Sequence, residues 1–385
     1  MVSIAGIIVG TMAIIIVVSV VNGFSDLLGQ FYSSFDPDLK ITSVEGKMFN
    51  PSDFNFDKVK THPDVAQYAE IIEEMALLKY GSQIYPATVK GVPKNYNNYT
   101  NIDSLLVKGS YTLEQEGINY AVIGHGVAIN LGIGLSFVDH IMVYVPKRGK
   151  QVSLNPSRAI NHNYVFPSGI FSVLEEIDSK YIIVSYDFAA DLFESKNQVS
   201  SVEISLSEDS NQSETQSEIQ DLLGDGFHVK NNYQQHEFVF KTTKSEKWAA
   251  YFILVFILLL ASVNMIGNLT MLYIDKKEDI SILRSMGLSM KKINQIFLYE
   301  GWLISFLGGV VGTVLGIFVC WLQIEFGLIR LPGATGSFVI SAYPVQIIFT
   351  DILLAFLAVM VIGFVASWYP VKFISQKHLS ESNIN

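Results

Sequence analysis

The chain has 385 residues, of which 50% are hydrophobic and 16% are charged. Soluble domains carry roughly 25% charged residues, so this composition indicates a membrane protein, as does the mean hydropathy of +0.34. The net charge of −10 and the lack of any lysine and arginine block argue against nucleic-acid binding. With Cys320 as its single cysteine, the chain can form no intrachain disulfide and suggests no cysteine-based metal site.

Four apolar runs are long enough to cross a bilayer, which takes roughly 20 residues of helix. We predict a transmembrane helix in each of them, at residues 1–23, 248–274, 296–322 and 345–370. A cleaved signal peptide is the alternative for the first run, but it lacks a basic amino-terminal region and an evident cleavage site. Because Met1 lies almost at the membrane edge, we expect an amino-terminal flank to be missing.

Basic residues are unevenly shared between the segments outside these runs. Segment 275–295 holds five of them and the tail 371–385 holds two lysines, whereas segment 323–344 holds only Arg330. Since basic residues in short loops mark the cytoplasmic side, we place segment 275–295 and the tail there. Residues 24–247 and 323–344 then lie on the outer side of the membrane.

The long segment 24–247 mixes strand and helix signals and is large enough for one or two small domains. Strands are predicted at 39–44, 83–92 and 140–146, a strand followed by a helix at 120–134 and at 181–193, and a helix followed by a strand within 208–231. We therefore predict a membrane protein with four transmembrane helices and a large two-lobed α+β extracytoplasmic domain between the first and the second helix.

No catalytic or metal-binding pattern is evident. The sequence has no P-loop of the form G-x-x-x-x-G-K-[S/T] and no H-E-x-x-H, and its seven histidines are scattered. His125 lies beside a glycine turn, where a lone histidine is more often structural, and the acidic pair Glu73 and Glu74 is most simply a solvated face. We expect no enzyme activity, cofactor or metal on this chain.

Small and amide residues recur at four-residue spacing in the apolar runs, which places them on one side of a helix. Small residues let membrane helices approach closely, within a chain or across a dimer, although glycine is also common in such helices generally. A buried amide in lipid needs a partner, so both asparagines are expected to face other helices. The candidate packing residues are Gly6, Gly10, Gly308, Gly312, Gly316, Asn264 and Asn268.

Segment 275–301, DKKEDISILRSMGLSMKKINQIFLYEG, reads as a short amphipathic helix between the second and third runs. Apolar residues at helical spacing form one side of it, and charged residues flank that side. Such a helix could dock in the groove of a soluble partner, or it could only anchor the two spans at the membrane surface. The candidate docking residues are Asp279, Ile280, Ile282, Leu283, Arg284, Met286 and Gly287.

The stretch from Asn264 to Gly316 resembles the FtsX/MacB-like ABC transporter permease family, and most closely its lipoprotein-releasing LolC/LolE branch, through NMIGNLTMLYIDKKEDISILRSMGL. The first run ends in a similar N-G-F, and WYPVKFISQ at 368–376 resembles the family's carboxy-terminal Y-P motif. The outer segment is similar in layout. One departure is GIGLSFVDH at 132–140, where the family has G-x-x-V-G-D.

The resemblance implies the membrane subunit of an ABC transporter in the inner membrane of a Gram-negative bacterium. Such a permease extracts lipoproteins from the outer leaflet among membrane lipids and passes them to a periplasmic carrier. A separate ATPase, which binds ATP and Mg, would drive it through a coupling helix within 275–295, and a second permease copy or a paralogue would complete it.

In the lipoprotein-releasing branch a loop of the outer domain recruits the carrier. The closest position here is the turn-rich connector 146–167, with Asn155, Pro156 and Pro167 as candidate contacts. From the residues alone, an ordinary variable loop is the simpler interpretation of this connector.

Three other functions stay open. One is a MacB-like exporter of peptides or drugs, although that type of permease normally carries its ATPase on the same chain. Another is an FtsX-like transmembrane signal transducer to periplasmic partners, which has a much smaller outer domain. The third is a membrane scaffold without transport. The cargo and the choice between homodimer and heterodimer are not fixed by the sequence.

Overall fold

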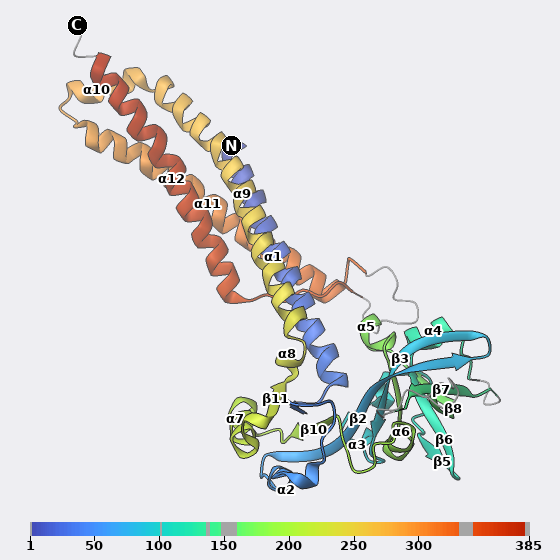
Figure 1. Ribbon diagram of the computed structural model, residues 1–385. Helices are drawn as coiled ribbons and strands as arrows, with labels where there is room; N and C mark the ends of the chain where they lie inside the picture. Colours follow the sequence, from blue (N-terminus) through green and yellow to red (C-terminus); the bar gives the residue numbers. More distant parts are fainter. Residues whose placement is uncertain (1, 101, 136–138, 148–159, 331–341, 382–385) are drawn as a thin grey trace. The chain divides into compact units, whose positions relative to one another are not determined.

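The computed structural model describes residues 2–100, 102–135, 139–147, 160–330 and 342–381 (Figure 1). The chain divides into two compact units. Within the described residues, the helical unit comprises residues 2–27, 238–330 and 342–381, and the sheet unit comprises Leu28–Glu237.

Four long helices dominate the helical unit, and all four are long and apolar enough to cross a membrane. They are α1 (Val2–Phe35), α9 (Glu237–Asp275), α11 (Met290–Phe326) and α12 (Phe349–Glu381), and the short α10 (Lys277–Ser285) connects α9 to α11 (Figure 1). All four extend past at least one end of their predicted apolar runs, because a helix keeps its internal hydrogen bonds where it leaves an apolar environment. Hydropathy therefore predicts where the apolar stretch lies more accurately than it predicts where the helix begins and ends.

The fourth helix begins later than its predicted run. Residues 345–348 are not helical. There the backbone N–H of Gln346 donates a hydrogen bond to the carbonyl of Ser19 at 2.9 Å, so this segment lies against α1 before α12 starts.

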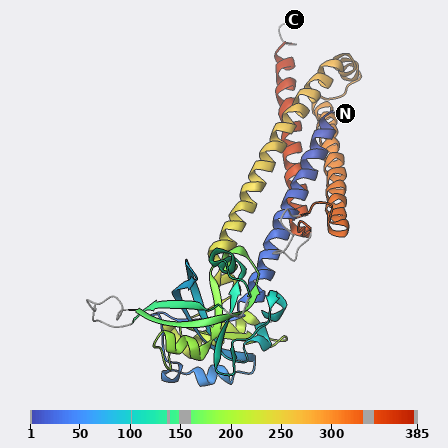
Figure 2. The ribbon, with the colours of Figure 1, turned by 90° about the vertical axis from the view of Figure 1, so that its right-hand side faces the viewer.

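Apolar side chains from α1, α9 and α12 form one buried cluster in the helical unit. It contains Ile7, Ile14, Ile15, Val18, Leu258, Met265, Leu269, Ala355, Val359 and Ala366. In both ribbon views α1 and α9 run alongside each other (Figures 1 and 2). The cluster thus makes one body of helices that are far apart in the sequence.

The described part of the sheet unit carries eleven strands, in the order β11-β1-β10-β2-β3-β9-β6-β8-β4, with β5 paired to β6 and β7 paired to β2 and β8. They are β1 (Leu39–Ser43), β2 (Val65–Tyr80), β3 (Gln83–Val92), β4 (Leu106–Gly109), β5 (Glu114–Gln115), β6 (Ile118–Gly124), β7 (Ile141–Pro146), β8 (Ile160–Phe171), β9 (Tyr181–Ser185), β10 (Ser201–Leu206) and β11 (Phe227–Asn231). The α-helices are α2 (Phe56–Lys60), α3 (Asn97–Thr100), α4 (His125–Leu131), α5 (Glu175–Asp178), α6 (Tyr186–Leu192), α7 (Gln212–Leu223) and α8 (Asn232–Gln235).

Two buried apolar clusters stabilise the sheet unit. The larger one gathers residues of β2, β3, β6, β7, β8 and β9 with α4 and α6. The smaller one gathers residues of β1, β10 and β11 with α2 and α7. The long strand β2 pairs with β10 near its start and with β3 and β7 near its end. It therefore connects the strands of the smaller cluster to those of the larger one.

The two ends of the sheet unit lie together. The ring of Tyr32, near the end of α1, stacks on the ring of His236, just before α9, with centroids 3.8 Å apart. Nε2 of His236 lies 2.6 Å from Oδ2 of Asp36. The chain therefore enters and leaves this unit at one place.

The prediction of a connector at 146–167 is wrong for residues 160–167, which belong to a strand. Residues 160–171 form β8, which pairs antiparallel with β7 from Pro146 opposite Ile160 onward. Pro167 is a buried strand residue beside Ala121, where the register with β6 shifts, and such an irregularity accommodates a residue without a backbone N–H. Asn155 and Pro156 lie outside the described residues.

Candidate functional site

The short helix α10 forms the connection between α9 and α11. Glu278 and Asp279 lie in its first turn and Arg284 in its last, so its charges complement the helix dipole. Its end is closed by Gly287, whose φ of +92° suits glycine, and by the backbone N–H of Leu288, which donates to the carbonyl of Leu283 at 3.0 Å. The predicted helix is present, and Gly287 ends it.

One side of α10 is fastened to the ends of the long helices. Ile280 is only 8% exposed and packs in a cluster with Tyr273, Ile293, Phe297 and Val371, which belong to α9, α11 and α12. The rings of Tyr273 and Phe297 lie 5.0 Å apart in this cluster. A force on α10 would therefore reach three long helices through direct contacts.

Three other apolar side chains of α10 and its carboxy-terminal cap are exposed on the surface of this chain. Ile282 is 60% exposed, Leu283 is 37% exposed and Met286 is 78% exposed. The sequence predicted Ile280, Leu283 and Met286 on one side, whereas the structure buries Ile280 and leaves the other two exposed. Adjacent large apolar residues left exposed on a short helix form a surface suited to a partner.

The predicted glycine stripe of α11 lies against α1. An added Cβ at Gly312 would lie 2.7 Å from the carbonyl oxygen of Ile8 and 2.7 Å from Cβ of Thr11. At Gly308 it would lie 2.8 Å from Cγ2 of Ile7. Because real Cβ atoms do not approach so closely, only glycine permits this helix contact, which is made within a single chain.

The remaining packing candidates make looser contacts. A Cβ at Gly316 would lie 3.1 Å from Ile15, whereas Gly6 and Gly10 face α9 at ordinary van der Waals distances. The amide of Asn268 donates a hydrogen bond to the hydroxyl of Ser3 and so ties α9 to α1. Asn264 is exposed on α9, so the expectation that it faces another helix is not met within this chain.

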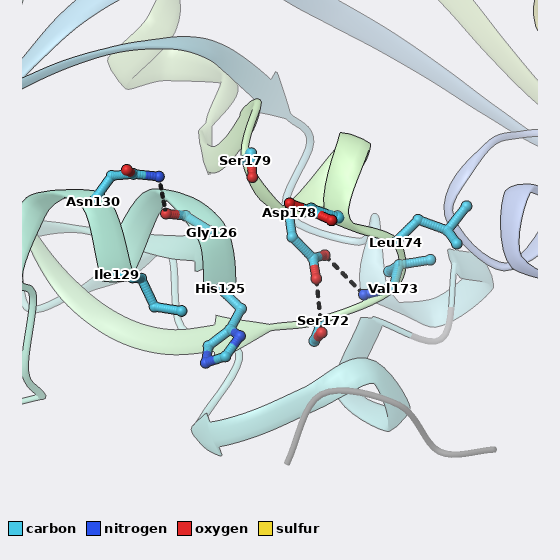
Figure 3. Close-up of a pocket in the computed structure, with 10 residues that line it drawn as sticks. His125, Gly126, Ile129, Asn130, Ser172, Val173, Leu174, Asp178 and Ser179 are labelled. Carbon is cyan, nitrogen blue, oxygen red and sulfur yellow. Dashed lines mark hydrogen bonds between the residues drawn. The ribbon is translucent and has the colours of Figure 1, made fainter. Parts of the chain in front are cut away.

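A pocket of about 290 Å³ lies beside α4 and α5 of the sheet unit (Figure 3). Its Asp178 accepts hydrogen bonds from the Ser172 hydroxyl at 2.7 Å and from the Val173 N–H at 2.8 Å, and burial raises the pKa of this carboxyl. An added Cβ at Gly124 would lie 2.2 Å from the Asp178 carbonyl oxygen. This glycine therefore allows close packing of α5, which supports a structural reading of the His125 turn.

Charged residues from four strands meet inside the sheet unit, a feature that sequence reasoning missed. Nζ of Lys90 lies 2.9 Å from Oε1 of Glu203, and both side chains are 1% exposed. Nζ of Lys40 contacts Glu73 at 2.5 Å and Glu203 at 3.7 Å. Burial alone would raise the pKa of Glu73, but Lys40 and Lys90 outweigh it and lower that pKa to about 2. The expectation of a solvated face at Glu73 is therefore wrong.

Nothing in the described parts of the chain resembles a metal centre, since no cluster of three or more histidine, cysteine or acidic side chains there could hold an ion. Surfaces and helix contacts are other described features that suit a function. The surface of α10 and the four long helices stand out among them.

Comparison with known proteins gives two family matches. Residues 251–379 match the FtsX-like permease C-terminal family, and residues 1–222 match the MacB-like periplasmic core domain. The second match alone covers more than half of the chain.

Several relatives resemble the chain over most of its length. The lipoprotein-releasing system transmembrane protein LolC of Buchnera aphidicola is 28% identical over 98% of this chain and 92% of that protein. LolC of Xylella fastidiosa is 24% identical over 96% and 90%, and LolE of Haemophilus influenzae is 22% identical over 95% and 89%. The solved periplasmic region of MacB from Actinobacillus actinomycetemcomitans is 12% identical over 54% of this chain and 94% of that chain, with a TM-score of 0.36.

Proposed function

Because the chain belongs to the FtsX/MacB-like permease family, we propose that it is the membrane subunit of an ABC transporter that releases lipoproteins. It would extract them from the outer leaflet of the inner membrane of a Gram-negative bacterium and pass them to a periplasmic carrier. The observation that carries the proposal is the near full-length similarity to LolC and LolE proteins, which are named for this release. The exporter and signal-transducer alternatives have no comparable full-length relative among these matches.

In this proposal α10 is the coupling helix that receives force from a separate ATPase, which binds ATP and Mg. Ile282, Leu283 and Met286 form the contact surface, because they are apolar and exposed. Ile280 passes the movement on, because it packs against the ends of α9, α11 and α12.

The cargo's acyl chains would enter beside α1 and α9, in a cavity completed by a second permease copy or a paralogue. Large apolar side chains of α9 lie exposed on the surface of this chain, among them Phe252, Ile253, Phe256, Leu260 and Val263. Such residues suit contact with lipid tails, with acyl chains or with the helices of a second permease.

The carrier would bind one face of the sheet unit, which we call the apolar sheet face. Residues directly opposite each other on paired strands share a face, and the pairs Leu77–Tyr144, Tyr144–His162 and Pro146–Ile160 place the exposed side chains of β2, β7 and β8 together. This face includes Met75, Leu77, Ile84, Ile160 and Tyr164, all exposed. It flanks the strands that lead into and out of the proposed carrier-binding loop.

Leu283→Asp tests the docking surface. A charge on the exposed apolar side of α10 should remove productive contact with the ATPase, so lipoprotein release by the reconstituted transporter should fall at least tenfold. The measurement is transfer of a labelled lipoprotein to the carrier, together with ATP hydrolysis. Ser281→Asp is the matched control, because it adds the same charge at an exposed position away from the apolar side. Normal release by the Leu283 variant would rule out the docking surface.

Replacing Met75 and Tyr164 together by serine tests the apolar sheet face. The loss of exposed apolar area should weaken carrier binding severalfold while the fold stays intact, because neither side chain is buried. Binding is measured with the purified permease complex immobilised and the carrier titrated over it. Exposed Val107 and Ile118 replaced by serine provide the control, since neither belongs to the apolar sheet face. An equal loss of carrier binding in both variants, or no loss in either, would contradict the proposal that the apolar sheet face binds the carrier.

A further inference from the structure

Asp351, near the start of α12, is a carboxylate shared by three long helices. Its Oδ2 accepts hydrogen bonds from the amide of Asn22 at 2.6 Å and from Nζ of Lys247 at 2.7 Å. Its Oδ1 accepts a hydrogen bond from the Tyr251 hydroxyl at 3.2 Å. Asn22 belongs to α1, whereas Lys247 and Tyr251 belong to α9. One side chain therefore joins α1, α9 and α12 at the end of the helical unit where α12 begins.

The link from α12 to α1 has several independent parts. Besides the Asn22 contact, the Gln346 N–H donates to the Ser19 carbonyl. A Cβ at Gly23 would lie 2.6 Å from the backbone of Pro344 and Val345, so the chain before α12 packs directly on α1. Asn22 itself is 5% exposed. These contacts make α1 and the start of α12 one firmly joined pair.

The link from Asp351 to α9 is different in kind. It is made by the tips of two long side chains, and the Lys247 side chain is 26% exposed while that of Asp351 is 11% exposed. A charged tip that is partly accessible to water can exchange partners at lower cost than a buried amide. The α9 side is therefore the part of this junction that can be released.

Helix α9 connects the Asp351 junction to α10, so release of Lys247 and Tyr251 from Asp351 can be coupled to events at α10. α9 leads directly into α10, the proposed docking helix, and it is packed against α1 further along by Leu258 against Gly10 and by the Asn268–Ser3 hydrogen bond. A movement started at α10 would therefore have to pass along α9 to reach Lys247 and Tyr251.

We propose that Asp351 is the fixed half of an ionic latch, and that Lys247 and Tyr251 leave it when the partner ATPase binds nucleotide. Release lets this end of α9 move away from the joined α1–α12 pair, and closing returns it. Asp351 is thereby a positioning residue for the cargo path beside α1 and α9. The inference rests on the proposed function for the source of the movement, but the latch itself is defined by contacts within one chain.

The test measures the distance between α9 and α12 in the purified complex with its ATPase. Spin labels are placed at Glu246→Cys and Thr350→Cys, both exposed positions, in a Cys320→Ser background. We expect one short distance without nucleotide and a second, longer distance when a non-hydrolysable ATP analogue is bound. Lys247→Gln should populate the longer distance without nucleotide and raise ATP hydrolysis without cargo severalfold.

Two variants make the result decisive. Lys244→Gln, the same change at an exposed lysine one turn earlier, should leave the distances as in the wild type. The charge exchange Lys247→Asp with Asp351→Lys should restore the short distance if the ion pair is the latch. A single unchanged distance in the Lys247 variant, or no recovery on charge exchange, would overturn the latch.

The same experiment separates the latch from the proposed function. The distance readout needs no lipoprotein. A latch that opens with nucleotide in a complex that releases no lipoprotein would leave the latch standing and overturn the cargo assignment. A complex that releases lipoprotein with a constant α9–α12 distance would do the reverse.

Discussion

The helical unit and the sheet unit both hold charged side chains that are largely shielded from water. The two units differ in how many oppositely charged partners each charge has. In the sheet unit Glu203 is contacted by Lys90, by Lys40 and by the hydroxyl of Tyr96 at 2.7 Å, and Glu73 pairs with Lys40. The charges there are balanced two against two. In the helical unit Asp351 meets one cation, Lys247.

The difference teaches where the molecule can move. A mutually balanced network built around the buried pair Lys90–Glu203 must be lost as a whole, so it fixes β1, β2, β3 and β10 in one arrangement. A carboxylate with a single, partly exposed cation can lose that cation and still keep its amide partner. The sheet unit is therefore built to stay rigid, whereas the helical unit contains a junction that can open.

The largest effect is expected from Lys90→Met. This change leaves Glu203 buried with only the more distant Lys40 to balance it, and breaking a buried pair costs about 3–5 kcal/mol. The measurement is the free energy of unfolding of the full chain in detergent. Lys196→Met is the control, because its pair with Asp191 is exposed and should be worth less than about 1 kcal/mol. Similar losses in the two variants would remove the contrast between rigid and releasable charge pairs.

A smaller effect is expected from Gly312→Ala. The added methyl would lie 2.7 Å from Ile8 and Thr11, so α11 must move away from α1, and such overpacking costs about 1–3 kcal/mol. Gly10→Ala is the matched control, because its nearest contact, Leu258, is at 3.5 Å and needs no adjustment. Thermal unfolding in detergent compares the two. Equal stability would mean that α1 and α11 can separate freely, and the firm core assumed for the helical unit would not exist.

Features set by local pattern were predictable from the sequence. The apolar runs predicted the four long helices, and the strand–turn–helix signal at 120–134 predicted β6 and α4. The helix at α10 and the close approach of the α11 glycines also followed from residue spacing. Each of these depends on neighbours within about one or two turns of the chain.

Features set by distant neighbours were not predictable. Strand β2, VAQYAEIIEEMALLKY, carries charged and alanine residues that do not favour a strand locally, and it is held by pairing with β10, β3 and β7. Glu73 looked solvated because its partner Lys40 comes from another strand. Asp351 was visible in the fourth run, but its partners lie 104 and 329 positions away.

The contact between Tyr32, Asp36 and His236 has an evolutionary consequence. Since the two ends of the sheet unit meet there, this unit is joined to the rest of the chain like a domain inserted into a loop. An insert with adjoining ends can be enlarged, trimmed or exchanged during descent without changing the spacing of the helices that carry it. The same set of long helices can in this way carry different inserted domains.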